Sequence, residues 1–228
     1  MTAAMDIAPL LGVTTGVTAL IGGGGKTTLL YTLTEELRRW GTVILTTSTH
    51  IQVPPDYPLL PGDDAASLAA ALAAHGAVCA AGRSQEGKLA APALSFETLA
   101  SLADYVLVEA DGSKRLPLKA HAPHEPVIPA CAGTVVYVVG ADGFGKPVAQ
   151  VCHRPEHYAA LCGVPSSAPV TPAMAAQVLR AEGYDDGVVY INKVEDDVAA
   201  EEAAALAQLL RGRVVSGSLH HRTYRRLR

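Results

Sequence analysis

The chain has 228 residues and a formal net charge of −4, with 22 acidic and 18 basic residues. This acidic balance argues against a surface for nucleic acid or an anionic membrane, and no apolar run approaches membrane length. With no basic leader and no C-x-x-C pair among the four cysteines, we expect a cytoplasmic protein with reduced thiols. The length suits a single α/β domain over residues 1–228.

The first predicted elements are a buried strand over residues 17–21 and a helix from Lys26 that ends before Gly41. Four glycines and Lys-Thr-Thr join them. Glycines reach the backbone angles that point N–H groups at a phosphate, and a helix N-terminus adds further amides. The predicted phosphate-binding residues are Gly22, Gly23, Gly24, Gly25, Lys26, Thr27 and Thr28. A glycine-rich linker is the alternative, since the first glycine of the usual G-x-x-x-x-G-K-[ST] loop is here Leu20.

Strand-like and helical segments alternate along the rest of the chain. Continuous β-branched runs predict strands over residues 42–47, 105–110, 134–139, 188–192 and 213–217. Helical patterns occupy residues 65–74, 96–102, 155–162, 172–182 and 198–211. The alternation predicts a P-loop NTPase-type three-layer sandwich with a mainly parallel sheet. Residues 76–92 break the rhythm and predict a small inserted hairpin, and residues 119–133, with three prolines, predict a long loop.

Two acids stand at the C-terminal end of the predicted strand over residues 105–110. Glu109 and Asp111 are two residues apart, so both side chains lie on one face if the strand persists. A carboxylate at this place completes the Mg²⁺ site of P-loop proteins, in which the threonine after the lysine also binds the metal. We therefore predict a metal site from Thr27 with Glu109 or Asp111, and the two acids are also catalytic candidates. Buried structural acids are the alternative.

Two further segments end strands at the same edge of the sheet. TTSTHI makes His50 a catalytic candidate, in a loop that senses the γ-phosphate or in an ordinary turn. INKVED places Asn192 and Lys193 where N-K-x-D proteins bind a guanine base, although Glu195 replaces the aspartate. The alternative is a strand end that caps the next helix.

The segment after Asp111 is basic and rich in proline. Its candidate residues for a substrate pocket or a switch loop are Lys114, Arg115, Lys119, His121 and His124. We expect the segment from Asp111 to Pro129 to be mobile without ligand and ordered by a triphosphate.

The motifs GGGGKTT, TTSTHI, VEADGSKRLPLKAHAPHEPVIP, GADGFGKP, CHRPEH and INKVED together resemble the YqeC-type family of selenium-dependent hydroxylase accessory proteins. The resemblance runs in order from about Leu10 to about Ser218. It implies kinship with P-loop GTPases and ATPases that mature metalloenzymes. It also implies a role in making or inserting the selenium and molybdenum cofactor, with a molybdenum hydroxylase or its cofactor-insertion proteins as partner.

From these observations we predict a Mg²⁺-dependent maturation factor that binds and hydrolyses ATP or GTP. Two rivals remain open. A small-molecule kinase would use the same loop and hold its substrate on the basic segment. A nucleotide-sensing scaffold would bind nucleotide without turning it over.

Overall fold

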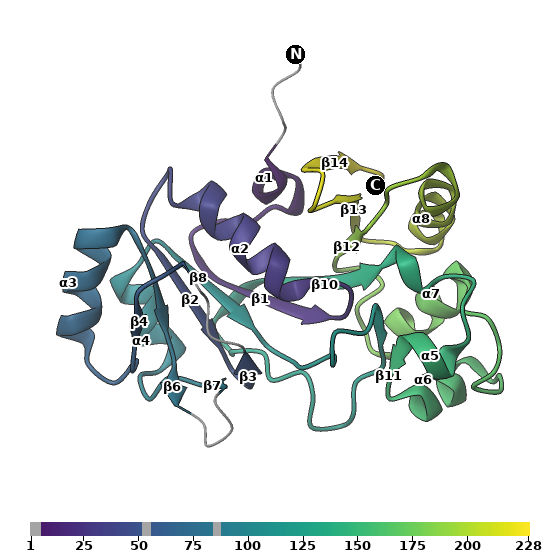
Figure 1. Cartoon of the computed structure of the whole chain (residues 1–228), viewed down its shortest axis with the longest axis horizontal. Coiled ribbons are helices and arrows are strands. Elements are labelled where there is room, and N and C mark those ends of the chain that lie inside the picture. The colour runs from purple at the N-terminus through teal and green to yellow at the C-terminus, as the bar shows by residue number, and fades with distance from the viewer. Residues whose placement is uncertain (1–5, 52–55, 84–87) are drawn as a thin grey trace, which may run out of the picture.

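The computed structural model describes residues 6–51, 56–83 and 88–228. Within them, a nine-stranded sheet has the order β14-β13-β12-β10-β1-β8-β2-β5-β4 (Figure 1). Neighbouring strands are parallel, apart from the antiparallel pair of β13 and β14 at one edge. The strands are β1 (Gly16–Gly22), β2 (Val43–Thr47), β4 (Leu59–Leu60), β5 (Ala77–Ala80), β8 (Tyr105–Glu109), β10 (Ala132–Gly140), β12 (Val188–Asn192), β13 (Arg213–Ser218) and β14 (Thr223–Arg226).

Helices cover both faces of the sheet (Figure 1). One face is covered by α1 (Ile7–Leu11) and α2 (Lys26–Leu37). The other face is covered by α3 (Ala65–His75), α4 (Phe96–Leu102), α5 (Val148–Val151), α6 (Pro155–Cys162), α7 (Pro172–Ala181) and α8 (Asp197–Leu209). Among the described helices, none has both the length and the apolar character needed to cross a membrane.

The central strands are apolar on both sides because both faces are covered. In β1, Val17, Ala19 and Ile21 pack into the core on one face of the sheet, while Leu20 packs into the core beneath α2 on the other. A strand buried on both faces has no solvent-facing positions, so its sequence is a continuous apolar run instead of an alternating pattern.

Side-chain caps fix where several helices begin. Asp64, Ser95, Thr171 and Asp196 each accept a hydrogen bond from a backbone N–H in the first turn of α3, α4, α7 and α8, respectively. Such caps satisfy amides that the helix itself leaves without a partner. The caps therefore fix the point at which the chain enters each of these four helices.

The structure confirms the α/β sandwich and the six predicted strands, with small differences at their ends. The predicted hairpin over residues 76–92 is only partly present. Its first piece is β5, which joins the main sheet, and the antiparallel pair is β6 (Gly82–Arg83) with β7 (Leu89–Ala90), extended by β3 (His50–Ile51). The polar turn expected at residues 84–87 lies outside the described residues. The single-domain organisation stays a prediction.

Candidate functional site

The glycine loop is short because β1 continues to Gly22 and α2 already begins at Lys26. Gly22, Gly24 and Gly25 have φ angles of 92°, 79° and 128°, which other residues rarely adopt. Leu20 is still inside β1 and buried, so this loop has no position for the first glycine of the usual pattern. The departure in the sequence therefore reflects a shorter loop.

The loop lies against its neighbours backbone to backbone. A Cβ atom on Gly24 would come within 2.3 Å of the Gly140 nitrogen, and one on Gly23 within 2.7 Å of the Leu116 oxygen. The N–H of Gly23 donates to the Val138 oxygen at 2.9 Å, and that of Gly24 to the Leu116 oxygen at 3.0 Å. These two amides anchor the loop, contrary to the prediction that they face a phosphate. The first amides of α2 have no partner within the helix and remain for a ligand.

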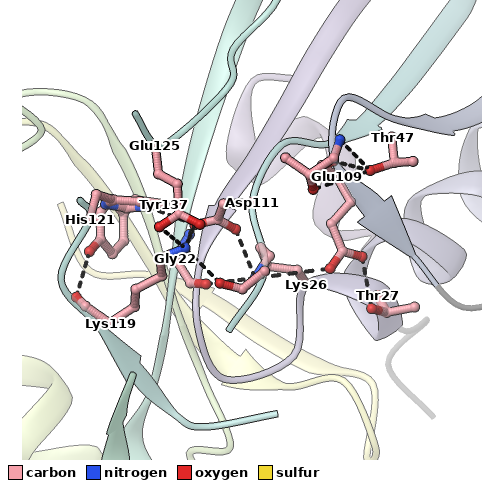
Figure 2. Close-up of polar contacts among 12 residues, drawn as sticks. Gly22, Lys26, Thr27, Thr47, Glu109, Asp111, Lys119, His121, Glu125 and Tyr137 are labelled. Carbon is pink, nitrogen blue, oxygen red and sulfur yellow. Dashed lines mark hydrogen bonds and ion pairs between the residues drawn. The ribbon is translucent and has the colours of Figure 1, made fainter. Parts of the chain in front are cut away.

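The lysine of the loop is folded inward. Lys26 is 3% exposed, and its Nζ donates to the Gly22 oxygen at 2.6 Å. The same nitrogen lies 2.9 Å from Asp111 Oδ1 and 4.0 Å from Glu109 Oε1. Figure 2 shows Lys26 between Glu109, the last residue of β8, and Asp111, two residues further on. The ammonium is therefore positioned by two carboxylates and by the loop that it closes.

Glu109 and Thr27 form the open part of this cluster. Thr27 Oγ1 donates to Glu109 Oε2 at 2.8 Å, and both residues line the cleft described below. Burial raises the pKa of the Glu109 carboxyl above its usual value, although Lys26 and the hydrogen bond from Thr27 oppose this shift. The pair presents a hydroxyl and a carboxylate oxygen side by side, which suits a hard cation such as Mg²⁺.

Asp111 has a different environment from the one that its spacing predicted. Its side chain is fully buried, and Oδ2 accepts from Gly22 N at 2.9 Å and lies 3.1 Å from Lys119 Nζ and 2.6 Å from His121 Nε2 (Figure 2). Burial alone would raise the pKa of the Asp111 carboxyl, yet Lys26, His121 and Lys119 hold it well below the usual range. Oδ2 thus has several protein partners, whereas Oδ1 has the ion pair with Lys26 and no hydrogen-bond partner among the described residues. The metal-binding and catalytic roles predicted for Asp111 stay predictions, although Glu109 is the acid of the two that lines the cleft described below.

A buried chain of polar contacts extends from Asp111 to the end of α7. His121 Nδ1 lies 2.7 Å from Glu182 Oε2, and the His121 N–H donates to Glu182 Oε1 at 2.7 Å. Burial would lower the pKa of His121, but its contacts with Asp111 and Glu182 raise it above its usual value. Lys119 and His121 are buried and are not among the residues that line the cleft described below. The substrate-pocket or switch-loop role that the sequence predicted for them stays a prediction. Glu182, which follows α7, carried no signal in the sequence.

A cleft of about 820 Å³ opens beside the glycine loop. It brings together ten of the predicted residues: Gly24, Gly25, Lys26, Thr27, Thr28, His50, Glu109, Lys114, Arg115 and Lys193. Its remaining walls come from residues that the sequence analysis did not single out: Thr49, Lys88, Gly112, Ser113, Glu125 and His153. His124 is exposed and does not line this cleft.

The segment predicted to bind the base also braces the loop. Asn192 Nδ2 donates to the Gly24 oxygen at 2.8 Å, and Asn192 Oδ1 accepts from Leu219 N at 3.2 Å. Lys193, which lines the cleft, has a φ angle of 63° and an ion pair with Asp142 at 2.8 Å. Glu195 accepts a hydrogen bond from Ser218 Oγ at 2.7 Å. Contact of these residues with a base stays a prediction.

The hydroxyl-rich turn after β2 divides into two parts. Thr46 Oγ1 donates to the Ala80 oxygen at 2.6 Å and Thr47 Oγ1 to the Glu109 oxygen at 2.8 Å, so both are turn and sheet contacts. Thr49 and His50 line the cleft. His50 is therefore in a position from which it could reach a ligand in the cleft, and its predicted catalytic role stays a prediction.

Comparisons with known proteins agree with the motifs. A model of the YqeC protein family matches residues 18–156, more than half of the chain. A protein of Escherichia coli (strain K12) named "Uncharacterized protein YqeC" is 34% identical over 158 residues, which cover 65% of this chain and 61% of that protein. The chain thus corresponds to about three fifths of that relative's length. Among solved structures, the signal recognition particle 54 kDa protein from Aeropyrum pernix K1 in complex with GDP aligns with a TM-score of 0.42 and 15% identity, over 93% of this chain and 44% of that one.

Proposed function

The chain belongs to the YqeC family, and from this premise we propose that it binds and hydrolyses a nucleoside triphosphate with Mg²⁺ in the cleft at the glycine loop. The observation that carries the proposal is the position of Lys26. A buried lysine at the start of a helix, flanked by two carboxylates and opening onto a cleft, is poised to exchange its protein partners for phosphate oxygens.

The phosphates would contact the amides of Gly25 to Thr28 and the Lys26 ammonium. To reach them, Lys26 would release the Gly22 oxygen and Asp111 Oδ1. Asp111 would still be neutralised, because Lys119 and His121 remain on Oδ2. The buried network therefore lets the lysine move without leaving an uncompensated charge, which would otherwise cost several kcal/mol, roughly 3–5.

The metal would be held by Thr27 Oγ1 and the Glu109 carboxylate. Their oxygens are 2.8 Å apart at the wall of the cleft. Mg²⁺ commonly takes only one or two carboxylates from the protein and completes its shell with phosphates and water, so this small donor set fits. When bound, the ion would neutralise charge on the phosphates. Glu109 would orient the Thr27 hydroxyl, and Lys26 would hold the phosphate chain.

The base would lie against the Lys193 stem, near Glu195, whose carboxylate is oriented by Ser218. Because Asn192 holds the Gly24 oxygen, an Asn192→Ala variant would disturb the loop as well as the base. Lys193→Ala is the cleaner test. The Lys193→Ala variant should bind a nucleoside triphosphate more weakly and inorganic triphosphate as well as wild type does. In a separate test, a stronger preference for GTP over ATP in Glu195→Asp would indicate that the natural base is guanine.

Product analysis tests the proposed reaction. The full chain is incubated with ATP or GTP and Mg²⁺, and the products are separated. A parallel sample also contains the small-molecule fraction of a cell extract, from which proteins have been removed by filtration. Release of inorganic phosphate that is lost in Lys26→Ala supports the hydrolase. A phosphorylated small molecule would instead support the kinase, and tight nucleotide binding with no product would support the sensing scaffold.

We further propose that the cycle serves maturation of selenium-dependent molybdenum hydroxylases, as the family resemblance of the sequence implies. A cell that makes such a hydroxylase offers the test. Deleting the gene should lower hydroxylase activity, and wild-type protein should restore it while Lys26→Ala does not. Unchanged hydroxylase activity in the deletion strain would reject this role and leave nucleotide binding untouched.

A further inference from the structure

A row of alternating charges leads away from the glycine loop. We name its members, Lys26, Asp111, Lys119, Glu125 and Arg154, the charge ladder. Successive contacts measure 2.9 Å from Lys26 to Asp111, 3.1 Å from Asp111 to Lys119, 3.1 Å from Lys119 to Glu125 and 2.9 Å from Glu125 to Arg154. Asp111 and Lys119 are fully buried in the middle of the row. The charge ladder thus connects the nucleotide site to a second region of the protein.

The cleft contains both regions. Its walls include Lys26 at the first position of the charge ladder and Glu125 near the other end, together with His153 beside it. The cleft of about 820 Å³ is in the upper part of the range of roughly 300–1,000 Å³ that is usual for ligand pockets, and its walls extend from the glycine loop to Lys114, Arg115 and His153. The part of the cleft near Glu125 and His153 is not used by the nucleotide-binding groups described above.

Two consecutive basic residues in this cleft have a strained backbone. Lys114 and Arg115 have φ angles of 49° and 63°, and both side chains are exposed and line the cleft. A left-handed conformation costs a residue with a Cβ about 1–2 kcal/mol. The turn is held in place because Leu116 N donates to the Ser113 oxygen at 2.9 Å and the Leu116 oxygen accepts from Gly24. Strain of this kind persists where surrounding structure enforces it, and it is concentrated at ligand sites.

His153 adds an unsatisfied polar atom to the same wall. It belongs to β11 (Cys152–His153), which pairs with β9 (Leu118–Lys119). Its Nδ1 is buried and has no hydrogen-bond partner among the described residues. Burial lowers the pKa of His153, and the positive charges of Lys119, Arg154 and Lys114 lower it further, whereas the carboxylate of Glu125 opposes this shift. The neutral ring thus lies in a strongly cationic environment and lacks one hydrogen bond.

We propose that this wall, formed by Lys114, Arg115 and His153, binds a second ligand: a small molecule with a phosphate or carboxylate group. The inference builds on the proposed function, because it places this ligand next to the nucleotide in the same cleft. The two cations neutralise the oxyanion, and the imidazole gains the hydrogen bond that it lacks when the ring turns toward the ligand. The ligand would be the acceptor or the regulator of the nucleotide reaction.

Calorimetric titration with inorganic phosphate tests the second site, with malonate as the carboxylate probe. The full chain is first saturated with Mg²⁺ and a non-hydrolysable triphosphate, so that the glycine loop is occupied. Wild-type protein should bind one of the two probes saturably at one site. The double variant Lys114→Ala/Arg115→Ala should weaken that binding at least about tenfold, and His153→Gln several-fold.

Arg222→Ala is the matched control. Arg222 is basic and exposed with a φ angle of 52°, but it does not line the cleft, and its loss should leave probe binding unchanged. A second arm uses nucleotide-free Lys26→Ala, whose fold is checked by thermal melting, and it should still bind the probe. If wild type fails to bind the triphosphate, the proposed function fails while this second arm still tests the inference. Three results would each overturn the proposed second site: equal weakening of probe binding in Arg222→Ala, loss of probe binding in Lys26→Ala, or no saturable probe binding by wild type.

Discussion

At the scale of single residues, Asp111 determines the charge balance of the site. One carboxylate faces two ammonium groups and an imidazole, all within 3.1 Å, and it also accepts from the Gly22 amide. Because the side chain is fully buried, no water can replace these contacts. The position of Lys26 and the end of β1 both depend on this carboxylate.

Asp111→Asn should therefore be strongly destabilising. The amide keeps the size of the side chain but removes the buried charge between Lys26 and Lys119, which leaves Lys26 with Glu109 at 4.0 Å and Lys119 with Glu125. Breaking a buried ion pair costs about 3–5 kcal/mol. Urea denaturation should show a fall of that order in the free energy of unfolding. Asp186→Asn, at a side chain that is 69% exposed and 4.0 Å from Arg211, should change it by less than about 0.5 kcal/mol. Equal effects of the two substitutions would contradict the role given to Asp111.

The sequence predicted ten of the residues that line the cleft but not how their side chains are oriented. GGGGKTT predicted the glycine loop because few other functions need four glycines before a lysine and two threonines. The spacing of Glu109 and Asp111 could not tell which acid faces the cleft, since that depends on Lys119 and His121 packing over Asp111. Glu182 and His153 reach the site from distant segments. His153 stands in the CHRPEH motif, but nothing in the residues around Glu182 marks it.

At the scale of elements, the glycine loop depends on close backbone contact as well as on backbone angles. Gly24 and Gly145 have nearly equal φ angles, 79° and 74°, but a Cβ would meet the Gly140 nitrogen at 2.3 Å in the first case and open space in the second. Gly145→Ala should cost only the left-handed backbone penalty, about 1–2 kcal/mol. Gly24→Ala should cost about 1–3 kcal/mol more.

Thermal and urea unfolding of Gly24→Ala and Gly145→Ala separate the cost of the left-handed backbone from the cost of the close contact with Gly140. Gly24→Ala should also abolish triphosphate binding, because the loop must move away from β10. Gly145→Ala should bind normally. If the two variants were equally stable and bound nucleotide equally well, close packing of the loop would not matter.

The start of α7 offers a second prediction at this scale. Thr171 caps the helix by accepting from Met174 N at 3.3 Å, and Glu182 at the far end of the helix holds His121. Thr171→Ala should lower the free energy of unfolding by about 1 kcal/mol, measured in urea, and Thr171→Ser should be nearly neutral. A serine variant as unstable as the alanine variant would show that the hydroxyl cap is not responsible.

Strands were well predicted where the apolar run in the sequence was long. The six predicted strands are continuous apolar runs, and both faces of the sheet are covered, so sequence and structure agree. The prediction that the first part of residues 76–92 belongs to a hairpin was wrong, because the sequence of a four-residue strand such as β5 does not show which strand it pairs with. In the structure β5 pairs with β2 and β4. β4 and β14 are short strands whose assignment depends on neighbours that are known only in the folded chain.

At the scale of the whole molecule, the segment after β8 connects the glycine loop, where we propose that nucleotide binds, with the rest of the cleft. The sequence predicted that residues 111–129 would be mobile, yet Lys119 is buried and ion-paired while Arg115 is exposed. Trypsin should therefore cleave after Arg115 and not after Lys119 in the free protein. A non-hydrolysable triphosphate with Mg²⁺ should slow the cut at Arg115, and the diphosphate should not.

Mass spectrometry of the fragments over time measures this protection. Cleavage in the exposed segment around Arg222 serves as the internal control, since it should proceed at the same rate in all ligand states. Rapid cleavage after Lys119 would contradict the buried network. Equal rates at Arg115 with diphosphate and triphosphate would reject a response to the γ-phosphate.

The central claim is that Lys26 and the glycine loop bind the phosphates of a nucleotide. Isothermal titration of the full chain with a non-hydrolysable triphosphate and Mg²⁺ tests it, comparing wild type, Lys26→Ala and Lys146→Ala, an exposed lysine that does not line the cleft. The account predicts one site in wild type, the same affinity in Lys146→Ala, and at least about tenfold weaker binding in Lys26→Ala, because charge-assisted contacts contribute about 1.5–3 kcal/mol. Equal affinity of Lys26→Ala and wild type, with both proteins folded, would contradict it.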